Sequence, residues 1–135
     1  MKIAYFSCPP SGNAGDTVIT AATKQIFERF HGPIRWVEMD FRKKTSLLDV
    51  LTCRRSDAVL IGGGGLFLKD TNPNKISGWQ WKIPIWKLKL LKKPLIMYAL
   101  GYNRFRGQED FDDIFYKHID ACLETAEFVG LRDVG

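Results

Sequence analysis

The chain has 135 residues, of which 45% are hydrophobic, and this length suits one compact α/β domain rather than a two-domain enzyme. Twenty basic and fifteen acidic residues give a formal charge of +5, which favours anionic partners but is too diffuse to indicate a nucleic-acid-binding protein. Three widely spaced cysteines argue against a disulfide framework, and no apolar run approaches the roughly 20 residues of a membrane-spanning helix. The apolar N-terminal stretch is also too short for a secretory signal, so we expect a cytoplasmic protein.

The first 40 residues are predicted to alternate from strand to helix to strand. Residues 2–7, KIAYFS, have the pattern of a buried strand, and residues 34–40 that of a second strand. A helix over 16–30 is expected between them because apolar residues recur at helical spacing: Ile19, Ala22, Ile26 and Phe30. Asp16 is the expected N-cap, since its carboxylate can accept hydrogen bonds from the unpaired amides of the first turn.

A second helix and a third strand follow. The helix is expected over 45–54, with Thr45 or Ser46 as its cap and one apolar face formed by Leu47, Leu48 and Leu51. Residues 57–61, DAVLI, form the continuous apolar run of a strand that is buried on both faces. The glycine run that begins at Gly62 is expected to end this strand.

The second half of the chain continues the alternation. Residues 66–78 are rich in turn-forming residues and are expected to form a loop, after which Pro84 opens a helix that ends near Lys92. Strands are predicted at 94–100 and 128–131. A helix over 109–126 separates them, and its apolar stripe is the most regular in the chain: Phe111, Ile114, Phe115, His118, Ile119, Cys122 and Leu123.

This order of elements predicts an α/β fold, a Rossmann-like doubly wound parallel sheet of about five strands with helices on both faces. Ligands of such sheets bind outside the carboxyl ends of the strands. Three turns that follow predicted strands are rich in glycine or asparagine, namely SGNAGD, GGGG and GYNR. We therefore expect a binding site where these turns meet.

A dinucleotide site is the first candidate for these turns, because glycines follow the first strand and Asp40 ends the second. The spacing argues against it. The first loop reads G-x-x-G-D rather than G-x-G-x-x-G, and the carboxylate of Asp16 would repel a pyrophosphate at the helix start. We expect no bound cofactor and no metal site.

Two interpretations of the glycine and asparagine turns remain open. Successive amides of the glycine run could cradle an anion, or the missing side chains could only let the strand pass close to the first loop. Asn13 has donors and an acceptor that suit sugar hydroxyls, but asparagine is also an ordinary turn residue.

Four motifs together resemble a known family. GNAGD, DAVLIGGGGLF, KKPLIMYALGYN and VGLRD resemble, in order and spacing, the N-terminal half of polysaccharide pyruvyl transferases. The resemblance covers essentially the whole chain. It implies the N-terminal domain of a two-domain protein with the fold of B-type glycosyltransferases, whose second domain is absent from this sequence.

The resemblance also implies an activity. Family members transfer the pyruvyl group of phosphoenolpyruvate to a sugar of a surface polysaccharide or exopolysaccharide, in a cleft between the two domains. Most basic residues that bind phosphoenolpyruvate, and the proposed catalytic histidine, belong to the second domain, so the fragment alone is expected to be inactive. We assign no catalytic residue here, because His31 and His118 have plainer structural explanations.

The residues expected to line this cleft from the present side come from the strand-end turns. They are Asn13, Gly15, Asp16, Gly62, Gly63, Gly64, Gly65, Gly101, Asn103 and Arg132. Asp16 is either a sugar ligand or only a helix cap. Arg132 either reaches a phosphate or carboxylate across the cleft, or pairs with Asp133 to tie the strand end to a loop.

A stretch rich in tryptophan and lysine, residues 78–93, allows a peripheral membrane contact. The alternative is a helix that buries its indoles and leucines while Lys87, Lys89 and Lys92 extend into solvent. Two other functions also remain open: a glycan- or protein-binding module without catalysis, and a nucleotide-sugar-dependent glycosyltransferase.

Overall fold

A computed structural model of the protein describes residues 1–8, 14–68, 74–102, 107 and 109–132. The strands are β1 (Lys2–Ser7), β2 (Arg35–Asp40), β3 (Ala58–Phe67), β4 (Leu95–Tyr102) and β5 (Ala126–Leu131). The helices are α1 (Ala14–His31), α2 (Leu47–Arg54), α3 (Ile85–Leu90) and α4 (Asp113–Thr125).

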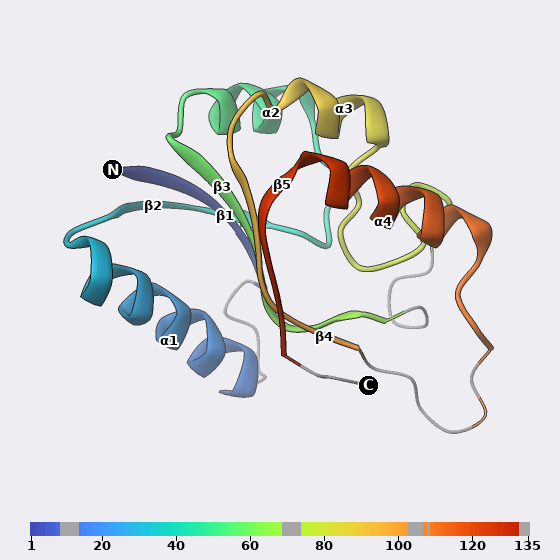
Figure 1. Ribbon diagram of the computed structural model, residues 1–135, viewed down its shortest axis with the longest axis horizontal. Coiled ribbons are helices and arrows are strands. Elements are labelled where there is room, and N and C mark those ends of the chain that lie inside the picture. Colours follow the sequence, from blue (N-terminus) through green and yellow to red (C-terminus); the bar gives the residue numbers. More distant parts are fainter. Residues whose placement is uncertain (9–13, 69–73, 103–106, 108, 133–135) are drawn as a thin grey trace.

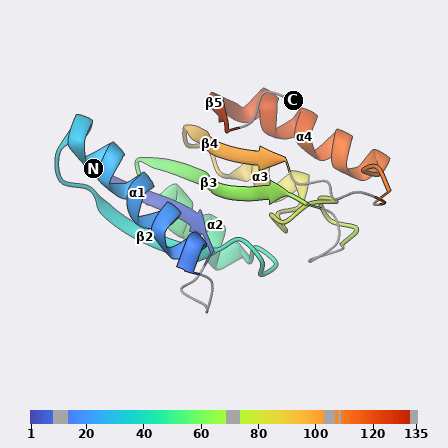
Figure 2. The ribbon, with the colours of Figure 1, turned by 90° about the horizontal axis from the view of Figure 1, so that it is seen from below.

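The five strands form one parallel sheet in the order β2-β1-β3-β4-β5. Within the described residues, α1 lies on one face of the sheet, and α2, α3 and α4 lie on the other (Figures 1 and 2). The predicted Rossmann-like, doubly wound α/β fold is therefore confirmed. The chain leaves β1 toward β2 on one side and reaches β3 on the other, so the topological switch point lies between β1 and β3.

The sheet has a hydrophobic core on each face. The larger core lies under α2, α3 and α4 and includes Phe6, Trp79, Trp81 and Leu88, which are each at most 1% exposed. The smaller core lies under α1 and is built around Tyr5 and Leu60. Buried aromatic rings contribute most per residue to such cores, because each removes a large apolar area from water.

The third strand is longer than predicted. β3 runs through the glycine run to Phe67 instead of ending at Ile61. Gly62 pairs with Tyr98 and Gly64 with Leu100 of β4, so the glycines remain within the ladder although their φ angles are positive. The glycines therefore form part of the carboxyl-terminal half of the strand.

The predicted apolar face of the first helix is wrong. Phe30 is 84% exposed and Ile26 is also exposed, whereas the buried residue of α1 is Thr23. A threonine is tolerated there because its hydroxyl donates a 2.9 Å hydrogen bond to the carbonyl oxygen of Ile19. Local satisfaction of this hydroxyl allows a polar residue to face the sheet.

The predicted face of the second helix is also wrong. The leucines expected in the core, Leu47, Leu48 and Leu51, are all exposed, and Val50 and Cys53 are buried instead. The capping prediction is confirmed for Ser46, whose side chain accepts from the amide of Asp49 while the Asp49 carboxylate accepts from the amide of Ser46.

The stretch of residues 78–93 splits between core and surface. Trp79 and Trp81 are fully buried, whereas Trp86 in α3 is 56% exposed. Lys87 does not extend into solvent as predicted: it is buried and donates a 2.6 Å hydrogen bond to the carbonyl oxygen of Thr45. That bond satisfies an ammonium group that would be costly to bury without a partner.

Candidate functional site

The parallel sheet brings the carboxyl ends of all five strands to one rim, where the sequence predicts that the turns meet. Of the predicted site residues, Gly15, Asp16, the four glycines of β3, Gly101 and Arg132 are described. Asn13 and Asn103 lie outside the described residues, as does Asp133, the predicted partner of Arg132.

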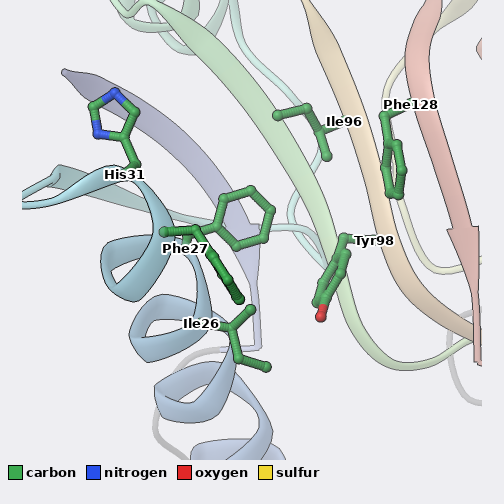
Figure 3. Close-up of a pocket in the computed structure, with 7 residues that line it drawn as sticks. Ile26, Phe27, His31, Ile96, Tyr98 and Phe128 are labelled. Carbon is green, nitrogen blue, oxygen red and sulfur yellow. The ribbon is translucent and has the colours of Figure 1, made fainter.

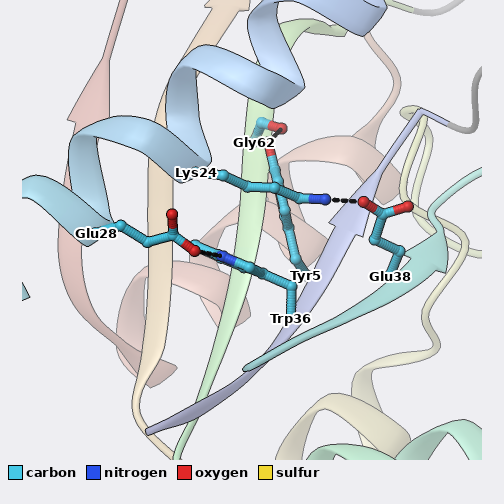
Figure 4. A network of polar contacts seen from close by, with 6 residues as sticks. All are labelled: Tyr5, Lys24, Glu28, Trp36, Glu38 and Gly62. Carbon is cyan, nitrogen blue, oxygen red and sulfur yellow. Dashed lines mark hydrogen bonds and ion pairs between the residues drawn. The ribbon is translucent and has the colours of Figure 1, made fainter. Parts of the chain in front are cut away.

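The second half of α1 is held against β2 by polar contacts (Figure 4). Lys24 of α1 forms an ion pair with Glu38 of β2, and the indole nitrogen of Trp36, also in β2, donates a 2.8 Å hydrogen bond to Glu28 of α1. The hydroxyl of Tyr5 in β1 donates a 3.2 Å hydrogen bond to the carbonyl oxygen of Gly62 in β3. The first two contacts fix the helix against β2, and the third joins the two strands at the switch point.

Close packing accounts for the first two glycines of the run. A Cβ atom at Gly62 would lie 1.7 Å from the carbonyl oxygen of Tyr98, and one at Gly63 would lie 2.8 Å from the hydroxyl oxygen of Tyr5. Burial raises the pKa of Tyr5, against smaller opposing effects of hydrogen bonds with Thr23 and Thr20. Tyr5 is therefore a neutral structural donor beneath the glycine run.

Gly64 is also buried, but it lacks the close contacts of Gly62 and Gly63 and lies beside Asp16. The nearest atom to a Cβ built at Gly64 is Oδ1 of Asp16, at 4.0 Å. Asp16 is the third residue of α1 and partly exposed, so its predicted position as N-cap is wrong by at least two residues. Its carboxylate, with the exposed Gly15 before it, stands in the first turn of the helix at the rim.

Arg132 lies against Gly101. A Cβ atom at Gly101 would lie 2.5 Å from Nη2 and 2.8 Å from Cζ of Arg132, so the guanidinium covers the backbone of β4 where a side chain would otherwise stand. The amide of Arg132 also donates a 3.0 Å hydrogen bond to the carbonyl oxygen of Leu100. Because Leu100 is in register with Gly64, these contacts place the guanidinium on the same rim as Asp16.

Arg42 is a rim residue that the sequence interpretation missed. Its Nε lies 3.3 Å from Oδ1 of Asp40, and these hydrogen bonds are the largest of the effects that raise the pKa of Arg42. Cys8 and Asp16 raise it further by Coulombic interaction, so both lie within electrostatic range. Its position two residues after the end of β2 was the signal, because every strand end of a parallel sheet reaches the same rim.

A small hollow of about 190 Å³ lies beside the switch point, between α1 and the ends of β1 and β2. Its lining contains hydroxyl, ammonium and carboxylate groups, and consists of Cys8, Thr17, Thr20, Ala21, Lys24 and Glu38. Apolar atoms nevertheless form most of its lining surface, and its two charged groups, of Lys24 and Glu38, are paired with each other.

A larger hollow of about 360 Å³ has a different character. It lies between α1 and strands β4 and β5 and is lined by Ile26, Phe27, Phe30, His31, Ile96, Tyr98 and Phe128 (Figure 3). Nearly all of its lining is apolar, so it offers few groups that could orient an anionic or sugar substrate.

His118 lies away from the rim, within the larger core. The ring is fully buried and its Nε2 is 2.6 Å from the carbonyl oxygen of Ile83. Burial lowers the pKa of His118, and the hydrogen bond to Ile83 opposes this effect. The described residues contain no cluster of three or more His, Cys, Asp or Glu side chains that could hold a metal ion.

The chain was compared with known proteins and with models of protein families. A search of curated proteins finds no match to the chain. A model of the family described as polysaccharide pyruvyl transferase matches residues 13–135, which includes every rim residue named above except Cys8. The chain therefore belongs to the polysaccharide pyruvyl transferase family.

Proposed function

We propose that the protein takes part in transferring the pyruvyl group of phosphoenolpyruvate to a sugar of a surface polysaccharide or exopolysaccharide. Family membership implies a glycan acceptor. The observation that carries the proposal is the presence on one rim of the carboxylate of Asp16, in the first turn of α1, and the guanidinium of Arg132, against β4. The carboxylate of Asp16 suits sugar hydroxyls, and the guanidinium of Arg132 suits the anionic donor.

The reaction needs groups of both kinds. Two sugar hydroxyls add to C2 of the enolpyruvyl group, the C2–O bond to phosphate breaks, one hydroxyl proton moves to C3, and the other leaves with inorganic phosphate. Negative charge on the donor's phosphate and carboxylate must be held throughout, which is a role for arginine. We assign no general acid to the described residues.

We further propose that the chain forms the N-terminal domain of a two-domain enzyme and that the active site lies between the domains. Exposed apolar side chains at the rim support a facing domain: Val18 near the start of α1, Tyr102 at the end of β4 and Leu131 at the end of β5. The chain alone is then inactive, because the second domain supplies the catalytic residues.

We propose a cytoplasmic location with contact to a membrane surface. The odd number and wide spacing of the three cysteines favour a reducing compartment. No helix in the described part of the chain is long and apolar enough to span a membrane.

Asp16→Asn tests the acceptor role in the complete enzyme, with phosphate release from phosphoenolpyruvate as the readout. We expect the KM for the glycan to rise by about tenfold, which corresponds to one hydrogen bond to a charged group, with the KM for phosphoenolpyruvate unchanged. Asp120→Asn, on the exposed side of α4, is the matched control. If the KM for the glycan is unchanged in Asp16→Asn, the role of Asp16 is purely structural.

Arg132→Gln tests the donor role in the same assay. We expect a rise in the KM for phosphoenolpyruvate with little change for the glycan, because only the donor is anionic. Arg35→Gln, an exposed arginine at the opposite ends of the strands, is the control. Glycan binding without any release of phosphate by the complete protein would instead favour the non-catalytic binding module.

A further inference from the structure

The outer surfaces of α2 and α3 carry large apolar side chains that are exposed. Leu48 is 74% exposed and Trp86 is 56% exposed. The full set, which we call the α2–α3 face, is Leu47, Leu48 and Leu51 of α2 with Trp86 and Leu90 of α3. Interfacial binding commonly uses such leucine and tryptophan side chains.

The two helices form one surface although about 40 residues separate them in the sequence. Lys87 of α3 donates its 2.6 Å hydrogen bond to the carbonyl oxygen of Thr45, directly before α2. The amide of Thr45 donates to the carbonyl oxygen of Lys82 at 3.0 Å, and the amide of Lys82 donates to that of Phe41 at 3.3 Å. Figure 1 shows the helices side by side on the same layer.

Positive charge is concentrated around this face. The two segments that build it, 41–56 and 81–94, contain ten of the chain's twenty Lys and Arg residues but only one of its fifteen Asp and Glu residues, Asp49. The rest of the chain is therefore net negative, although the whole chain is positive. Most of these basic side chains are exposed: Arg42, Lys43, Lys44, Arg54, Arg55, Lys89 and Lys92.

We propose that the α2–α3 face docks the protein on an anionic lipid surface. Its leucines and Trp86 would enter the interfacial region, and the surrounding basic side chains would contact lipid headgroups, an arrangement in which apolar burial and electrostatic attraction add. A second copy of this chain is a poorer occupant, because it would bring the same dense positive charge against itself. Charge complementarity thus selects the membrane.

The structure changes the membrane contact expected from the sequence. Of the three tryptophans in residues 78–93, Trp79 and Trp81 are core residues and only Trp86 is available for contact. The exposed leucines of α2 supply the remaining apolar area. The inference rests on the membrane contact proposed above and names its surface, but it is independent of the proposed reaction, because docking requires neither phosphoenolpyruvate nor a glycan acceptor.

Co-sedimentation with vesicles tests the proposal. We expect the protein to bind vesicles that contain phosphatidylglycerol at least about tenfold more tightly than vesicles of phosphatidylcholine alone, and to dissociate at about 0.5 M salt. Equal binding to both, or no binding to either, would overturn the proposal.

Paired variants separate the face from the rest of the surface. Leu48→Glu with Trp86→Glu removes apolar contact, and Arg54→Glu with Arg55→Glu reverses charge; each pair should weaken binding to anionic vesicles about tenfold or more. Phe30→Glu and the pair Arg29→Glu with Arg35→Glu are the controls, because these exposed residues lie on and beside α1. If the control variants weaken binding to anionic vesicles as much as the variants of the α2–α3 face do, the attraction is unspecific and the proposed docking face is wrong.

A protein partner at this face is the alternative outcome. We expect sedimentation velocity without lipid to show no self-association of the protein through this face. Self-association through it would be recognised by its loss in Leu48→Glu. If such association occurs and competes with vesicle binding, the α2–α3 face is a protein interface and the membrane proposal is wrong. Circular dichroism and thermal unfolding confirm that each variant is folded, which is expected since all substituted residues are exposed.

Discussion

The indole nitrogen of Trp79 donates a 2.8 Å hydrogen bond to Nδ1 of His118, across the buried core. Because an indole can only donate, Nδ1 is the acceptor and the proton of the neutral ring lies on Nε2, where it is donated to the carbonyl oxygen of Ile83. One imidazole thus joins α4 to two points of the segment before α3, and both ring nitrogens are used when the ring is uncharged.

Acidification should therefore destabilise the protein through His118. Since burial lowers its pKa in the folded state, the unfolded state binds a proton first as the pH falls below about 6.5. The free energy of unfolding should decrease with falling pH in this region, by at most about 1.4 kcal/mol per pH unit. Urea denaturation between about pH 5.5 and 7.5 measures the slope.

Two histidine variants identify the source of that slope. His118→Gln should be less stable than the parent protein but should lose most of the pH dependence in this range. His31→Gln, at the exposed end of α1, should keep it. A slope that survives in His118→Gln would assign the pH dependence to other groups.

Gly62→Ala and Gly64→Ala should differ greatly in stability. Both residues have φ near +150°, so each alanine carries a similar backbone cost, but only at Gly62 would the new Cβ meet backbone, 1.7 Å from the carbonyl oxygen of Tyr98. We expect Gly62→Ala to cost at least about 3 kcal/mol more than Gly64→Ala, or to prevent folding. Thermal unfolding of both variants measures this; equal losses would refute the steric explanation.

Cysteine reactivity should be confined to one site in the folded protein. Burial raises the pKa of both Cys53 and Cys122 to about 12, so almost no reactive thiolate is present at neutral pH. Cys8, which lines the hollow beside the switch point, is only partly buried. We expect one equivalent of thiol to react rapidly with a disulfide reagent, and three after unfolding in urea; Cys8→Ser should abolish the rapid phase.

Lys87→Met should destabilise the protein although methionine is apolar. It removes the hydrogen bond to the buried carbonyl oxygen of Thr45, and loss of a bond with a charged donor costs about 1.5–3 kcal/mol. Lys89→Met, on the exposed side of the same helix, should change the free energy of unfolding by less than about 0.5 kcal/mol. Similar values for both variants would mean that the Thr45 bond contributes nothing.

The order and type of the elements were predictable from the sequence because they depend on local periodicity and on turn residues. The faces of α1 and α2 were not. In α2 the leucines outnumber the buried Val50 and Cys53, so hydrophobicity alone selects the wrong side. In α1, Thr23 can be buried because its hydroxyl donates to the carbonyl oxygen of Ile19, a contact that hydrophobic periodicity does not take into account.

The rim of the sheet was predictable from the sequence, but the contacts of its residues were not. Parallel strands with glycine-rich ends fix the rim, and this required no side-chain geometry. What a glycine does depends on distant residues: Tyr98 explains Gly62 and Arg132 explains Gly101, whereas Gly64 has no contact closer than the 4.0 Å to Asp16. Such pairings across the sheet involve residues more than 30 positions apart, beyond the reach of local patterns.

The uneven distribution of basic residues gives the molecule a permanent electric dipole moment. At the sequence pI of about 9.2 the net charge vanishes, but the basic side chains around the α2–α3 face stay separated from most of the acidic ones. A cation-exchange resin should therefore still retain the protein near that pH. A negatively charged membrane should also turn the α2–α3 face toward itself before contact. Orientation at a surface is in this way built into the sequence.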